Sequence, residues 1–163
     1  MSTVWLTAIE ANPDPVTIRT SRTAVIVIDM QNDFCSKGGL FDRAGVNISI
    51  VQTAVGPTRR VLSAAREAGI KIVYLKMGFR PDLSDLGDAD SPNRARHLQL
   101  GVGQPNLAPD GSQGRFLIRD TWNTVSSTGC DLNLRTSCFT SIGSAVSTKQ
   151  NWTISSAGSE SGT

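Results

Sequence analysis

Histidine is almost absent from this chain: of its 163 residues, only His97 carries an imidazole. Metal sites built on several histidines, and catalytic triads that use a histidine elsewhere in the chain, are therefore excluded. Cysteine is also scarce, since Cys35, Cys130 and Cys138 are the only thiols and have no metal-type spacing. An odd number of cysteines without a secretion signal argues against a disulfide framework.

Long apolar runs and a strong excess of one charge are missing as well. No stretch approaches the roughly 18 apolar residues of a membrane-spanning helix, and the N-terminus lacks the basic and then apolar pattern of a signal peptide. The net charge is only +2 and the basic residues are scattered, so nucleic acid is not an expected partner. We therefore expect one cytoplasmic domain without membrane contact.

The strongest positive feature is a run of five apolar residues, 24–28, that stops at Asp29. A run of this length, rich in β-branched residues, predicts a strand buried on both faces of a parallel sheet. A carboxylate that ends such a strand lies at the carboxyl edge of the sheet, which is where open α/β folds bind ligands. Asp29 is therefore a candidate functional residue, or else an ordinary acidic residue where a strand meets a loop.

A helix and a second strand follow this first strand. Pro57 suits the first turn of a helix, Gly69 suits its end, and Val61, Leu62, Ala65 and Ala68 lie on one helical face. Residues 70–77 then read as a strand. The order strand, helix, strand predicts a βαβ unit with a right-handed crossover and a parallel sheet.

The flanking segments are less regular. Residues 1–22 are expected to form an extended N-terminal arm that leads into the first strand, and residues 79–114 a long loop with a function or short helices of its own. From residue 125 to residue 163 the composition changes, because 16 of these 39 residues are Ser or Thr and only 4 are charged. We expect this tail to be disordered.

The segment Val27-Ile28-Asp29-Met30-Gln31-Asn32-Asp33-Phe34, with Gly38-Gly39 after it, resembles the isochorismatase-like cysteine hydrolases. Two later segments, residues 79–85 and 119–124, are similar to the amidohydrolase branch of ureidoacrylate amidohydrolase and biuret hydrolase. The resemblance covers about residues 15–124. It implies a three-layer α/β/α domain with a mostly parallel sheet, of which residues 23–124 are the N-terminal part.

In this family an Asp, a Lys and a Cys form the catalytic triad, and the resemblance assigns the Asp to Asp29. It implies a small-molecule substrate with a ureido or acylurea group, and assembly of intact members as homo-oligomers. Metal-binding relatives carry histidines after the second strand, where this chain reads residues 77–81 without one. We therefore predict neither a metal nor another cofactor. The expected substrate-binding residues are Gln31, Asn32, Phe34, Arg80 and Trp122.

Other roles for these five residues stay open from the sequence. Phe34 and Trp122 suit core packing as well as substrate contact. The guanidinium of Arg80 suits either a carboxylate or ureido ligand or a solvated loop, and the amides of Gln31 and Asn32 suit hydrogen bonds to the loop backbone.

The tail departs from the family pattern. The family's Lys-His-Arg-x-Ser-Gly-Phe segment and its later cysteine have no match among residues 125–163, and Cys35, Cys130, Cys138 and Lys149 lack the matching surroundings. Codons for residues 137–154 can nevertheless be chosen so that a shifted frame spells V-L-Y-K-H-R-F-S-G-F. We hypothesise that the reading frame shifts near Thr124 or Val125 and that the tail is translated out of frame.

Two further interpretations remain open. Isochorismatase-type hydrolysis of a vinyl ether needs no cysteine, so the missing thiol does not exclude it. A non-catalytic binding protein that keeps part of the fold and uses the tail as a modifiable segment is the alternative from another class.

Overall fold

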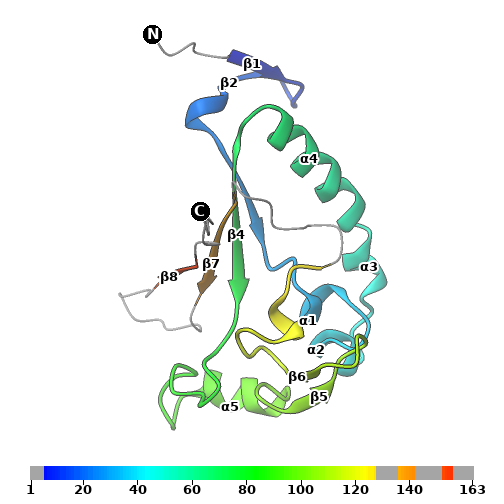
Figure 1. Cartoon of the computed structure of the whole chain (residues 1–163), viewed down its shortest axis with the longest axis vertical. Coiled ribbons are helices and arrows are strands. Elements are labelled where there is room, and N and C mark those ends of the chain that lie inside the picture. Colours follow the sequence, from blue (N-terminus) through cyan, green and yellow to red (C-terminus); the bar gives the residue numbers. More distant parts are fainter. Residues whose placement is uncertain (1–5, 128–135, 142–151, 156–163) are drawn as a thin grey trace, which may run out of the picture.

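A four-stranded sheet organises the chain (Figure 1). The computed structural model describes residues 6–127, 136–141 and 152–155. Three strands are parallel neighbours in the order β3 (Ala24–Ile28), β4 (Lys71–Met77) and β7 (Thr136–Ser141), and β8 (Trp152–Ser155) pairs antiparallel with β7. The predicted α/β class with a mostly parallel sheet is confirmed, as is the strand–helix–strand unit.

Helix α4 (Val55–Glu67) connects β3 to β4 and packs on one face of the sheet. Leu62 is fully buried and Ala65 is 3% exposed, both against Val27, Ile72 and Tyr74 of the strands. The outer positions differ from the prediction, because Val61 is 53% exposed and Ala68 is exposed too. The buried stripe is therefore narrower than the apolar pattern of the helix.

The other face of β3 is open. Ile26 and Ile28 are 57% and 60% exposed, although the sequence predicts a strand buried on both faces. Alternate residues of a strand point to opposite faces, so α4 can cover Val27 but not its two neighbours. In a three-layer domain a second layer of helices would cover Ile26 and Ile28, whereas both side chains are exposed here.

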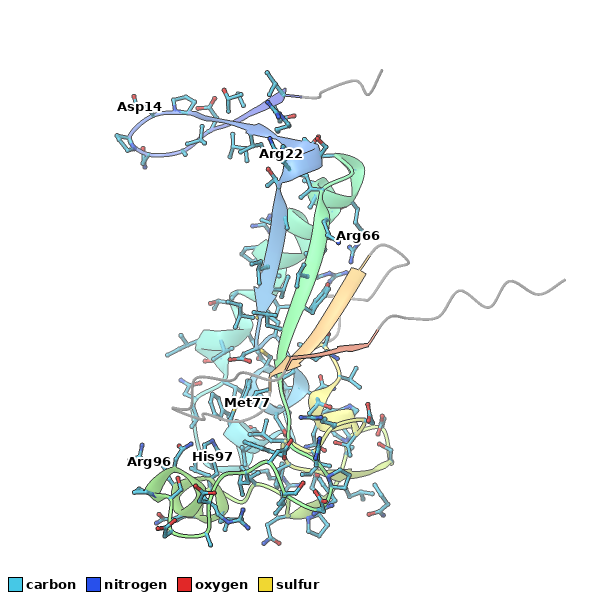
Figure 2. All side chains as sticks on the ribbon, turned by 90° about the vertical axis from the view of Figure 1, so that its left-hand side faces the viewer. Asp14, Arg22, Arg66, Met77, Arg96 and His97 are labelled. Atoms are coloured by element: carbon cyan, nitrogen blue, oxygen red, sulfur yellow. The ribbon has the colours of Figure 1, made fainter. Side chains whose placement is uncertain are left out.

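The N-terminal arm is a β-hairpin rather than an extended segment. β1 (Leu6–Ile9) pairs antiparallel with β2 (Val16–Arg19), and η1 (Thr20–Arg22) joins the hairpin to β3. Figure 2 shows the hairpin standing away from the sheet, with Asp14 at its tip. It lies at the end of the sheet opposite to Asp29.

Short elements gather beyond the carboxyl ends of the strands (Figure 1). They are α1 (Asn32–Cys35), α2 (Leu40–Arg43), α3 (Ser49–Gln52), α5 (Pro92–Gln99), β5 (Pro105–Leu107), β6 (Gln113–Arg115) and η2 (Trp122–Thr124). A second core holds them together, built from Phe34, Leu40, Phe79, Val102 and Leu117 among others. The long segment after β4 thus shares a core with the elements after β3 and carries the short helix α5, in agreement with the prediction for residues 79–114.

The structure differs from the expected disorder of residues 125–163 in part. β7 and β8 lie within this segment, and residues 125–127 pair with the loop after β3 through Asn32 N to Val125 O (3.0 Å) and Ser127 N to Met30 O (3.0 Å). The backbone groups of β4 on the side away from β3 pair with β7, and the Thr and Phe residues of β7 suit a strand. The rest of the tail lies outside the described residues.

Gly39 marks a close approach between α2 and α1. A Cβ atom added at Gly39 would collide with the backbone of Asn32 and Asp33. We expect Gly39→Ala to destabilise the fold by about 1–3 kcal/mol, because backbone must move to admit the methyl group. Chemical denaturation of the purified chain measures this change.

The matched control is Gly56→Ala in α4, where the added Cβ has open space and only a side-chain atom of Arg60 at 3.9 Å. This substitution is expected to be neutral or to stabilise the chain by up to about 1 kcal/mol. Equal effects of the two substitutions would contradict the packing described for Gly39.

Candidate functional site

Asp29 stands directly after β3, at the carboxyl edge of the sheet. Its amide donates to Leu75 O (2.9 Å) in β4, and its carbonyl oxygen accepts from Gln31 N (2.8 Å). Its φ is 56°, in the left-handed region that non-glycine residues seldom adopt. Such a conformation costs of order 1–3 kcal/mol and is typical of functional sites. The prediction that Asp29 follows a parallel strand is confirmed, whereas its catalytic role is a matter for proposal.

The carboxyl group of Asp29 is partly shielded from water. The residue remains exposed on one side, and loss of solvent on the other raises the pKa of this carboxyl above its ordinary value of 3.8. The nearby thiol of Cys35 is buried and donates to the backbone carbonyl oxygen of Asp29 (3.9 Å). A base with a raised pKa accepts a proton more readily, which is the property that general-base chemistry uses.

The side chain of Gln31 is a structural clamp. It is fully buried, its Nε2 donates to Met77 O (2.9 Å), and its Oε1 accepts from Met77 N (2.9 Å). Both halves of the amide are therefore used by the end of β4. The side chain thus bonds the last residue of β4, and its contact with a substrate stays a prediction.

Asn32 ties the same loop to η2. Its Nδ2 donates to Trp122 O (2.8 Å), and its Oδ1 accepts from Ser36 Oγ (3.0 Å). Trp122 itself is half-buried, so part of its indole stays accessible. The structure thus places Asn32 beside Trp122, and their contact with a substrate stays a prediction.

Phe34 belongs to the core. It is 9% exposed, and its ring centroid lies 4.7 Å from that of Phe41. Aromatic pairs at this separation stabilise a core by about 0.5–1.5 kcal/mol beyond their buried area. The packing interpretation of Phe34 is the one that the geometry favours.

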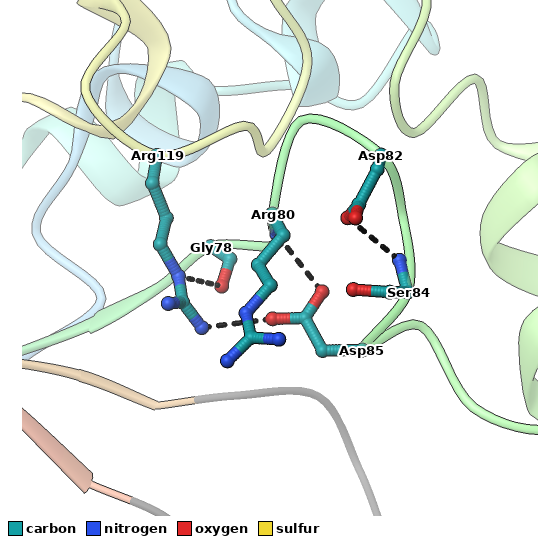
Figure 3. Close-up of polar contacts among 6 residues, drawn as sticks. All are labelled: Gly78, Arg80, Asp82, Ser84, Asp85 and Arg119. Atoms are coloured by element: carbon teal, nitrogen blue, oxygen red, sulfur yellow. Dashed lines mark hydrogen bonds and ion pairs between the residues drawn. The ribbon is translucent and has the colours of Figure 1, made fainter.

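Arg80 follows β4 in a loop that a neighbouring ion pair holds (Figure 3). The carboxylate of Asp85 accepts from the Arg80 amide (2.9 Å) and forms an ion pair with Arg119 Nη2 (2.8 Å). Arg119 Nε also donates to Gly78 O (3.1 Å). The loop backbone of Arg80 is thereby fixed, while its side chain is exposed. A guanidinium so placed can meet an anionic or carbonyl oxygen arriving from solvent.

A second carboxylate, Asp33, holds the site together and was not singled out by the sequence analysis. It is fully buried, and it accepts from Leu40 N (2.9 Å) and Asn123 Nδ2 (2.6 Å) on Oδ1 and from Leu117 N (2.6 Å) on Oδ2. Burial raises the pKa of Asp33, and these three hydrogen bonds oppose that shift. The repeated acid in Asp-Met-Gln-Asn-Asp was the available signal.

The geometry agrees with the results of sequence comparison. The isochorismatase domain family matches residues 23–142, which include β3, Asp29, β4 and β7. The chain belongs to the isochorismatase family. A carboxylate after a parallel strand occurs in several families, and this match identifies the family of this chain.

Curated relatives are about a third identical to this family member over the aligned residues. Ureidoacrylate amidohydrolase RutB of Agrobacterium fabrum is 36% identical over 115 residues, which are 69% of this chain and 48% of that protein. The enzyme of the same name from Yersinia enterocolitica is 33% identical over 117 residues, 71% of this chain and 49% of that protein. The chain therefore spans about half the length of the curated relatives it matches.

A solved structure supports the isochorismatase-like fold. The cysteine hydrolase from Pseudomonas syringae pv. phaseolicola superposes with a TM-score of 0.55 at 29% identity, over 76% of this chain and 47% of that one. The family match and the solved structure agree on the family and the fold of this chain. The residues of this chain that act on a substrate are the subject of the proposal below.

The described residues of this family member contain no cluster of metal ligands. Within residues 6–127, 136–141 and 152–155, no group of three or more His, Cys, Asp or Glu side chains is placed to hold an ion. His97 lies in α5, where its Nδ1 is 2.8 Å from Asn93 O and its ring packs edge-on against Phe79. In the same described part of the chain, no helix has the length and apolarity to cross a bilayer.

Proposed function

We propose that this chain carries the general-base half of a cysteine hydrolase site that cleaves a C–N amide bond in a small ureido or acylurea substrate. The observation that supports it most is Asp29, with a raised pKa and a left-handed backbone at the carboxyl edge of the sheet, in a chain similar to ureidoacrylate amidohydrolases. In this proposal, Asp29 occupies the position of the family's catalytic Asp.

The proposed reaction has two stages. The Asp29 carboxylate takes the proton of a cysteine thiol, and the thiolate forms a bond to the substrate's carbonyl carbon. The tetrahedral oxyanion collapses, the C–N bond breaks, and the departing nitrogen leaves with the proton held by Asp29. Water then adds to the thioester with proton transfer to Asp29, which releases the acid and restores the thiol.

The chain as it stands is proposed to be inactive because it lacks the nucleophile and the lysine. Among residues 125–163, Cys130, Cys138 and Lys149 lie outside the family's Lys-His-Arg-x-Ser-Gly-Phe pattern. Cys35 lies in α1, in the segment after β3, and not in the later segment where the family places its cysteine. A frame shift near codon 124 accounts for both losses.

Arg80 and Trp122 are the proposed substrate contacts whose side chains are most accessible to solvent. The guanidinium of Arg80 is exposed and would bind a carboxylate or ureido oxygen, while the half-buried ring of Trp122 would cover the planar ureido group. Gln31, Asn32 and Phe34 are proposed to support the pocket through the contacts described above. We further propose a cytoplasmic location, with homo-oligomers formed by the frame-restored protein.

The gene and an ammonia assay test the proposal together. We expect the shifted frame after codon 124 to encode the Lys-His-Arg segment and a later cysteine. The frame-restored protein should then release ammonia from ureidoacrylate or biuret, whereas the present chain should show no rate above background. An intact gene that encodes this tail alone would favour a non-catalytic binding protein, and a restored protein active only on a vinyl ether would favour isochorismatase-type chemistry.

A further inference from the structure

A cleft lies between α2 and α5, and none of the residues assigned to the hydrolase site lines it. Its volume is about 590 Å³, within the range of roughly 300–1,000 Å³ in which small molecules bind. The lining residues are Leu40, Arg43, Ala44, Arg96, Gln99, Leu100 and Phe116. Two are cationic, one is an amide and four are apolar, and none is acidic.

The two guanidinium groups face a cleft without a matching carboxylate. The nearest acid in sequence, Asp42, accepts from Gly38 N (2.8 Å) at the other end of α2. Within the residues that the structure describes, the ion pair of Arg119 with Asp85 is the only one formed, so neither Arg43 nor Arg96 is neutralised by a described neighbour. Arg96 lies on α5, where Figure 2 shows it near His97 at the end of the molecule opposite to the hairpin.

The apolar wall of the cleft is well fixed. Leu40 and Phe116 are 3% and 9% exposed, and a Cβ added at Gly101 would lie 4.0 Å from a side-chain carbon of each. Asp33 anchors the amide of Leu40 and that of Leu117, the neighbour of Phe116. Leu100 is 48% exposed and adds apolar surface to this wall.

From this arrangement we propose that the cleft binds a small organic anion with an apolar body, such as an aryl carboxylate or an aryl phosphate. Arg43 and Arg96 would hold the anionic group from two sides, because guanidinium groups bind carboxylate and phosphate with paired hydrogen bonds. Leu40, Leu100 and Phe116 would remove the apolar body from water. The site is independent of the proposed hydrolase function and needs no residue of that site.

Equilibrium dialysis of the full chain tests the proposal, with 2-naphthoate and 1-naphthyl phosphate as probes and 2-naphthamide as the neutral counterpart. We expect both anions to bind at least about tenfold more tightly than the amide, since charge-assisted hydrogen bonds are the stronger kind. Arg43→Gln and Arg96→Gln should each weaken naphthoate binding about tenfold, and added salt should weaken it further. Leu100→Ser should weaken the binding of all three probes.

The control variant is Arg59→Gln, which removes an exposed charge of α4 outside the cleft. It should leave naphthoate affinity within about twofold, because exposed charges at a distance are screened by salt. Circular dichroism melts check that each variant folds as the parent does. Equal affinity for naphthoate and naphthamide, equal losses in Arg59→Gln and Arg43→Gln, or no anion binding by the parent chain would each overturn the proposal.

Discussion

Replacing Asp29 by asparagine in the frame-restored protein is expected to lower kcat/KM for ureidoacrylate about 100-fold to 10,000-fold, the usual contribution of a general base. Asparagine keeps the size of the side chain and tolerates the left-handed backbone at this position (φ 56°), so the fold should survive the change. The amide cannot accept the thiol proton, and the loss should fall on the acylation step.

The pH dependence of the restored enzyme gives a second readout for Asp29. Only the ionised carboxylate can accept a proton, and partial burial raises its pKa above 3.8. The rate should therefore fall as the pH drops through this raised pKa, and the acidic limb should lie above the ordinary value for aspartate. In Asp29→Asn the residual rate should lose this limb.

Arg80→Met in the same protein separates binding from chemistry. The guanidinium is proposed to hold the substrate, so its loss should raise KM more than it lowers kcat.

If Asp29→Asn retains full activity and the same acidic limb, Asp29 is not the base, and the proposed roles must be reassigned.

Replacing Asp33 by alanine is expected to destabilise the present chain by about 3 kcal/mol or more. Its carboxylate accepts from the amides of Leu40 and Leu117 and from the side chain of Asn123. Each of these donors would be left buried without its partner, at a cost of about 1–3 kcal/mol. Leu117 has a φ of 53°, and the bond to Asp33 helps to hold this strained conformation. Urea denaturation measures the change.

Asp33 also determines the direction in which part of the stability changes with pH. Burial raises the pKa of Asp33, so the folded chain binds this proton more tightly than the unfolded chain. The free energy of unfolding should therefore contain a term that falls as the pH rises from 3.8 through the raised pKa, and Asp33→Ala should remove that term. The term is fully favourable below 3.8, where both states are protonated.

Asp110→Ala is the matched control for Asp33. Asp110 is exposed and accepts only from the amide and hydroxyl of Ser112. Its replacement should change the free energy of unfolding by less than about 0.5 kcal/mol, as for most surface substitutions. Similar losses for Asp33→Ala and Asp110→Ala would show that the buried carboxylate is not the link between the loops.

The sequence predicted an element correctly where its local pattern favours the same secondary structure that the fold requires. The apolar residues of β3 and β4 and the helix between them needed only periodicity, a proline and a glycine to be predicted. Asp29 could be placed at the sheet edge for the same reason, since it ends an apolar run. The resemblance to the family followed from residues 27–34, together with residues 38–39, 79–85 and 119–124.

The sequence was less informative about partners at long range. Gln31 bonds Met77, which is 46 positions away, and Asp33 bonds Asn123, which is 90 positions away. No local periodicity encodes such contacts, so the sequence left the role of Gln31 open and did not single out Asp33. The strands in the Ser/Thr-rich tail were missed because pairing of β7 with β4, and of β8 with β7, selects them rather than a local apolar pattern.

What the sequence alone determined is the α/β class, the family and the position of Asp29, because each follows from residues close together in the chain. Only the tertiary structure decided which polar groups are already hydrogen-bonded, which carboxyl groups lose contact with water, and which guanidinium groups line a cleft without an acidic neighbour among the described residues. Those properties depend on burial and on partners brought together by folding, so the clamp at Gln31, the anchor at Asp33 and the cleft at Arg43 and Arg96 became visible only there.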